Sequence, residues 1–243
     1  TVRALTYDGN SDLDVDWIWL KSRSGSGNHQ RYDSVRGTQK HVRSNLNSAE
    51  GTNGGTDGVT AFSSNGVTIG TNTASNDDGV TFVGWGWKAG TSFTNDASST
   101  GVGSIDSTGS VSTDAGFSII SYTGTGSIGT VAHGLGAVPK MILFKNRSRA
   151  SNWLVYHEAI GNTHNLYLDA TNEKGDRADT FNDTSPTSSV FTVGTADLNV
   201  SGDSIIAYCF ADVQGYSKFG EYTVSSSENN FIYLGFKPAF LMV

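Results

Sequence analysis

Short runs of apolar residues recur along the chain, separated by turns rich in glycine, serine and asparagine. The segments GFSIISYTG (116–124) and TFVGWGW (81–87) alternate between two faces, as strands covered on one side do. The runs KMILFK (140–145), SIIAYCF (204–210) and NFIYLGF (230–236) are continuous, which is typical of strands covered on both sides. Glycine interrupts nearly every stretch that would otherwise form a helix. The pattern therefore predicts an all-β protein.

The same succession of motifs occurs twice. Equivalent residues lie 124 positions apart, as Lys21 and Lys145 do, and 123 apart after a single deletion. The matched segments are DWIWLKSRS (16–24) with KMILFKNRS (140–148), VTIGT (67–71) with FTVGT (191–195), and VGWGW (83–87) with IAYCF (206–210). A constant spacing over about fifty residues indicates an internal repeat of one structural unit.

Two further matches extend the repeat at its ends. Upstream, TYDG (6–9) resembles SYTG (121–124). Downstream, EYT (221–223) and KPAFLMV (237–243) repeat SYT (121–123) and VPKMILF (138–144), so that a third copy is expected to begin there, with more chain after Val243. We expect two tandem antiparallel β-sandwiches of jelly-roll-like form. Their predicted ranges are 1–90 for the first sandwich, 91–115 for an exposed Ser/Thr/Gly-rich connector with at most one edge strand, 116–216 for the second sandwich, and 217–243 for a third repeat or closing strands.

Composition narrows the classes of function. The chain has 243 residues, a net charge of −7 and no basic run, which argues against a nucleic-acid surface. No apolar run approaches the ~20 residues of a membrane-spanning helix, so we expect no membrane insertion. A single cysteine, Cys209, excludes an internal disulfide and a cysteine-rich metal cage.

Four cations at the end of the most apolar strand are the first candidate binding residues. Lys21 and Arg23 in the first copy match Lys145 and Arg147 in the second. A pair of this kind suits a carboxylate or phosphate clamp, because guanidinium offers a bidentate fork. The structural alternative is that the cations bond turn carbonyls or a neighbouring acid. We favour the structural interpretation, because residues present in both copies serve the shared fold first.

Aromatic residues at alternating positions are the second candidate. Trp17 and Trp19 share one strand face, as do Trp85 and Trp87, and flat indole rings suit stacking on sugars. We favour a core role, because the positions require bulk and not an indole. Their counterparts in the second copy are Met141, Leu143, Tyr208 and Phe210.

The remaining candidates give no local catalytic or metal-binding pattern. The five histidines form no HxH or HxxxH pair, and no GxSxG elbow is present. Asp12, Asp14 and Asp16 alternate before Trp17 but lack a DxDxDG calcium loop. Cys209 matches a glycine between two aromatics, which is typical of a small buried residue. The sequence thus predicts no catalytic residues, no metal and no cofactor.

Several of these motifs, in order, resemble a known repeat domain of unknown function. They are DWIWLKSRS (16–24), YDSVRG (32–37), GFSIISYTG (116–124), HGLGAVPKMILFKNRS (133–148), NWLVYH (152–157), IAYCFADVQGYSKFGEYT (206–223) and GFKPAFLMV (235–243). The similar domain occurs in tail-fibre and structural virion proteins of marine tailed phages, including phages of cyanobacteria. The first copy departs from this pattern, because it lacks the HGLG loop and begins its strand with DLDVDW (12–17).

The resemblance implies a phage virion structural protein, a tail fibre or other appendage of stacked β domains, and brings no catalytic residues. A capsid-decorating or head-fibre protein and a glycan-binding adhesin stay open as alternatives; a glycan depolymerase would need a carboxylate pair that the sequence does not offer. We expect location in the virion after synthesis in the host cytoplasm, assembly as a homo-oligomer (a trimer) with other virion proteins, and no nucleic-acid partner. Contact with host glycan or surface protein is expected from the loops Asn28–Asn53, Gly126–Gly136 and Thr171–Pro186.

Overall fold

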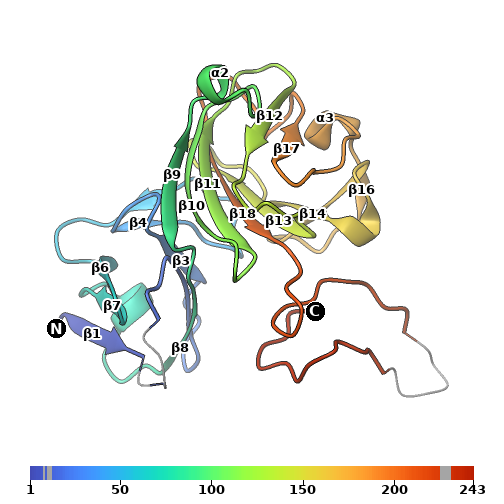
Figure 1. The fold of residues 1–243 in the computed structure, drawn as a ribbon. Helices are drawn as coiled ribbons and strands as arrows, with labels where there is room; N and C mark the ends of the chain where they lie inside the picture. The colour runs from blue at the N-terminus through green and yellow to red at the C-terminus, as the bar shows by residue number, and fades with distance from the viewer. Residues whose placement is uncertain (8, 10–12, 225–230) are drawn as a thin grey trace.

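The computed structural model describes residues 1–243 except 8, 10–12 and 225–230. Strands account for 37% of the chain and helices for 6%, and the strands form several antiparallel sheets. This confirms the all-β class and agrees with a β-sandwich architecture (Figure 1).

The N-terminal part contains two three-stranded sheets and one short strand pair. The first sheet has the order β3-β2-β8 and the second the order β1-β7-β6, while β4 pairs with β5. The bounds are β1 Arg3–Thr6, β2 Trp17–Ser22, β3 Gln30–Asp33, β4 Lys40–His41, β5 Gly51–Thr52, β6 Val59–Ser63, β7 Gly66–Ile69, α1 Thr73–Asn76 and β8 Phe82–Trp87. Ile18, Leu20, Val67 and Ile69 are buried in the core that these two sheets share.

The C-terminal part is built on an eight-stranded sheet of order β16-β15-β14-β13-β18-β11-β10-β9, with β12 and β17 forming a separate pair. Its elements are β9 Thr91–Asn95, α2 Ala97–Thr100, β10 Ser107–Ser112, β11 Phe117–Thr123, β12 Gly129–Ala132, β13 Met141–Asn146, β14 Leu154–His157, η1 Glu158–Ile160, β15 His164–Tyr167, β16 Gly175–Asp176, α3 Ala178–Phe181, β17 Val190–Val193 and β18 Ser204–Phe210. One face of the large sheet packs against β17 and α3 through Phe144, Phe181 and Phe191.

The other face of the large sheet is covered by the N-terminal sheet β3-β2-β8 (Figure 1). Trp17 of β2 stacks on Tyr208 of β18, with ring centroids 4.6 Å apart, and lies 5.6 Å from Phe117 of β11. Met141, Leu143 and Ile206 of the large sheet belong to the same cluster, as does Trp153 just before β14. The two copies of the repeat are therefore joined face to face by a hydrophobic core and not by a flexible connector.

Strand pairing repeats with the spacing seen in the sequence. Trp17 lies opposite Trp87 in the β2–β8 pair. Met141, 124 positions after Trp17, lies opposite Phe210, 123 positions after Trp87, in the β13–β18 pair. The same holds for β3 and β14, since Asp33 faces Trp17 as His157 faces Met141. The repeat therefore describes a common three-stranded unit.

The proposed match of TYDG (6–9) with SYTG (121–124) is wrong. Thr6 ends β1, which pairs with β7 as β12 pairs with β17, whereas β11 pairs with β18. Leu5 faces Val67 just as Val131 faces Phe191, so β1 takes the place of β12. The match used a spacing of 115, whereas the strand pairing places Leu5 at the position of Val131, 126 residues further along.

The segment predicted as an exposed connector carries more structure than expected. β9 and β10 both lie in it, and they form the edge of the large sheet beside β11. A hydrophobicity pattern does not reveal β10, because the strand consists largely of small residues. Gly109 is required there, since a Cβ atom at this position would lie 2.5 Å from the carbonyl oxygen of Ile119. Conversely, the apolar residues 231–243, predicted as strands, contain no strand and are mostly exposed, because nothing in the described structure pairs with them.

Candidate functional site

The densest group of buried charges lies where the two copies meet. Asp33 at the end of β3 accepts hydrogen bonds from Arg36 Nε (2.5 Å), the Arg36 backbone N–H (2.8 Å) and the Tyr208 hydroxyl (2.6 Å). Arg36 also donates to Glu50 (3.1 Å), and both members of the Asp33–Arg36 pair have fully buried side chains. The network therefore links the first copy to β18 of the second copy.

Arg147 and Lys145, two of the candidate clamp residues, are bound to the same region. Arg147 forms a two-pronged contact with Glu50, at 2.8 Å from Nε and 2.9 Å from Nη2. Lys145 Nζ donates to the carbonyl oxygens of Asn47 (3.0 Å) and Ser151. These contacts agree with the structural interpretation, because turn carbonyls bind Lys145 and an acid of the protein binds Arg147.

Arg31 of β3 is a fully buried cation in an aromatic cage. Its guanidinium carbon lies 3.9 Å from the Trp19 ring centroid, 4.9 Å from that of Trp153 and 5.4 Å from that of Trp17. None of its side-chain nitrogens has a hydrogen-bond partner among the described residues. Burial lowers the pKa of Arg31 to about 9. Attraction to the ring faces offsets part of the cost of burying this charge.

The four candidate tryptophans do not form one exposed platform. Trp17 is only 1% exposed and belongs to the core between the copies, as the core interpretation predicts. Trp85 and Trp87 are partly exposed, and Phe240 near the C-terminus contacts both, with ring centroids 6.1 and 5.9 Å away. A flat sugar would find no free row of indole rings here.

The loop Asn28–Asn53 lies largely against the second copy. The Trp153 indole N–H donates to the carbonyl oxygen of Arg43 (2.8 Å), and the Ser151 N–H donates to that of Asn47 (2.8 Å). Val42 in the same loop is fully buried. These contacts place Arg43 and Asn47 of the loop at the inter-copy interface, and host contact by the rest of the loop stays a prediction.

The acidic and thiol candidates lie in surroundings that give them structural roles. Asp16 accepts hydrogen bonds from the N–H groups of Ala89 and Gly90 and from Ser34, whereas Asp12 lies outside the described residues. Burial raises the pKa of the Cys209 thiol to about 12. Within the described part of the chain, no three His, Cys, Asp or Glu residues are grouped to hold a metal ion. None of the described helices is long and apolar enough to cross a membrane.

His41 makes the stability of the protein depend on pH. Burial, followed by the charges of Arg43 and Arg36, lowers its pKa from 6.5 to about 4. The unfolded chain therefore binds a proton between pH 6.5 and 4 that the folded chain does not, so stability should fall as the pH drops through this window. Urea unfolding at pH 7, 5.5 and 4 should show a steeper loss for the wild type than for His41→Gln. Equal slopes would contradict this assignment.

A shallow groove of about 280 Å³ lies at one end of the second copy. It is lined by Phe93, Asn95, Val102, Ala132, Gly134, Gly136, Ser188 and Ser189. Its floor includes the HGLG loop, which buried His133 holds by bonding to Leu135 N–H (3.2 Å) and Thr187 O (3.1 Å). No acid, base or thiol lines the groove, so its surface suits contact and not acid–base chemistry.

Comparison with known proteins gives one match. A family model described as a domain of unknown function (DUF7483) matches residues 7–243. No curated protein and no solved structure matches the chain.

Proposed function

We propose that this chain, which belongs to the DUF7483 family, is a structural component of a phage virion, a tail fibre or other appendage built of stacked β domains. The observation that carries the proposal is the face-to-face union of two repeated β units through one hydrophobic core. Stacking of this kind transmits load through buried side chains. The resemblance of its motifs to repeats in marine phage virion proteins supports the same role.

The proposed role includes no enzymatic step, metal or cofactor. Asp33 and Glu50 at the interface both bind Arg36, Glu50 also binds Arg147, and these contacts stabilise the union of the copies. Burial favours a higher pKa for Glu50, but the hydrogen bond from Arg147 and the charge of Arg36 outweigh it and lower the pKa, so Glu50 stays ionised near neutral pH. The proposal therefore assigns these charges to assembly.

In this role the protein is made in the host cytoplasm and assembles into the virion as a homo-oligomer, a trimer, with other virion proteins. Surfaces that are not buried between the two copies make the host contact. The loop Gly126–Gly136 and the groove beside Phe93 meet this condition, since they lie at the end of the second copy away from β2.

Immunogold labelling of purified phage particles tests the proposal directly. Antibodies against the purified chain should mark a fixed place on the particle, and mass spectrometry of the same particles should detect the chain. Label on the tail favours the appendage and label on the head favours a capsid fibre. Particles without the chain, with all of it left in the lysate of infected cells, would contradict a virion role.

A further inference from the structure

Strand β8 has an open edge that its counterpart in the second copy does not have. β18, the equivalent of β8, has β13 on one side and β11 on the other. β8 pairs with β2 on one side, and among the described residues no strand lies on its other side. In the second copy this place beside β18 is taken by β11, which pairs with β18 over all seven of its residues. A strand of the β11 type would therefore fit the edge of β8. An apolar edge left open is a template for strand addition.

Hydrogen-bond alternation shows which groups of β8 face outward. The Arg23 N–H bonds to Thr81 O on the β2 side, so in an antiparallel ladder Val83 and Trp85 also face β2. The backbone groups of Phe82, Gly84 and Gly86 then point to the open edge. Their counterparts Ile205, Ala207 and Cys209 face β11, since the Gly124 N–H bonds to Asp203 O in that ladder.

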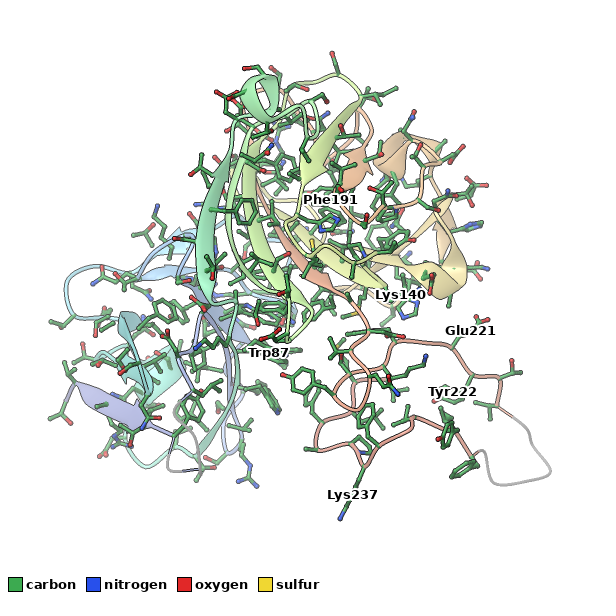
Figure 2. The ribbon with its side chains drawn as sticks, in the orientation of Figure 1. Trp87, Lys140, Phe191, Glu221, Tyr222 and Lys237 are labelled. Atoms are coloured by element: carbon green, nitrogen blue, oxygen red, sulfur yellow. The ribbon has the colours of Figure 1, made fainter. Side chains whose placement is uncertain are left out.

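The chain contains a second segment of the β11 type. Residues 217–223 carry EYT where β11 carries SYT, one hundred positions apart. Ser217 forms a bridge with Val213, and the Phe219 N–H donates to Asp212 (2.8 Å). Residues 220–223 form no strand, and Glu221 and Tyr222 lie on the exposed C-terminal part of the chain (Figure 2). Among the described residues, the N–H groups of Gly220 and Tyr222 have no hydrogen-bond partner. In the register of β11, these two N–H groups would face Gly84 and Phe82.

Charge also matches in this register. In the second copy, Arg147 reaches across β18 to the Ser121 hydroxyl of β11 (3.3 Å). Arg23 occupies the place of Arg147, is exposed, and has no acidic partner among the described residues. Glu221 occupies the place of Ser121. A segment added to β8 in the β11 register would therefore bring Glu221 to Arg23.

We propose that residues 220–223 of a second copy of this chain add to the edge of β8 as an antiparallel strand. The contact joins different surfaces of the two copies, so it generates a ring if the rotation closes and a filament if it does not. It supplies the partner strand that β11 supplies within the second copy. The inference goes beyond the virion role and does not rest on it.

A charge-reversal cycle tests the contact on the whole chain. Light scattering and sedimentation should show concentration-dependent association of the wild type. Glu221→Lys and Arg23→Glu should each weaken association about tenfold, because like charges then face one another. The double variant should restore it, since the pair is only exchanged. Both residues are exposed, so circular dichroism should show an unchanged fold.

A proline and alanine comparison tests the strand pairing itself. Tyr222→Pro and Tyr222→Ala both delete the side chain, but only proline removes the N–H that faces β8. Proline should weaken association about tenfold more than alanine does. A wild type that stays monomeric at all concentrations overturns the proposal, whether the segment is free or bound to its own β8. The proposal is also overturned if the substitutions leave association unchanged, or if the double charge exchange fails to restore association.

Discussion

Asp33→Ala should cost about 3–5 kcal/mol of unfolding free energy, because it leaves the buried Arg36 guanidinium without its closest counter-ion. Asp33 accepts three hydrogen bonds, two from Arg36 and one from Tyr208 of the other copy. Removing the carboxylate therefore leaves the Tyr208 hydroxyl without its partner and the buried Arg36 guanidinium with the more distant Glu50 as its acid. Glu50 contacts Arg36 only through Nη1 and is also bound by Arg147, so it compensates in part.

Equilibrium urea unfolding of the variant and the wild type measures this loss. Tyr208→Phe is the matched partner: it removes one hydrogen bond and keeps the ion pair, so about 1–2 kcal/mol is expected. Asp78→Ala removes an exposed carboxylate and should change stability by less than ~0.5 kcal/mol. A loss for Asp33→Ala no larger than that for Asp78→Ala would show that the buried network around Asp33 contributes little to stability.

The constant spacing of the repeat predicted the shared strands because it records register directly. The pairs Trp17–Trp87 and Met141–Phe210 are the same pair in two copies, and no knowledge of the turns was needed to match them. β10 escaped notice because its serines and glycine carry no apolar pattern. Its stability comes from pairing on both sides, with β9 and β11.

The inter-copy network was missed for a different physical reason. Arg31, Asp33, Arg36 and Glu50 occur in the first copy alone, and Asp33 has a histidine, His157, at the equivalent position. A comparison of the two copies identifies residues that both copies share. The network between the copies uses residues that occur in the first copy alone, so this comparison does not identify them. The signal available in the sequence was three charges placed close to Tyr32, a position where an amphipathic strand would bury apolar groups.

The core between the copies provides the second large effect. Trp17→Ala should cost about 3–5 kcal/mol, since the indole is 1% exposed and contacts aromatic rings of both copies. Because those rings belong to β8 and β18 alike, the cavity weakens both units. The two copies should therefore still unfold in one transition, at a lower urea concentration.

Far-UV circular dichroism and tryptophan fluorescence, followed together in urea, measure both the loss and its cooperativity. Trp17→Phe is the matched control: the Trp17 Nε1 has no hydrogen-bond partner among the described residues, so phenylalanine loses volume alone and should cost roughly half as much. Two separated transitions in the wild type would show that the copies fold independently. With the interface shared, a cavity at one residue of the first copy should instead lower the stability of all eight strands of the large sheet.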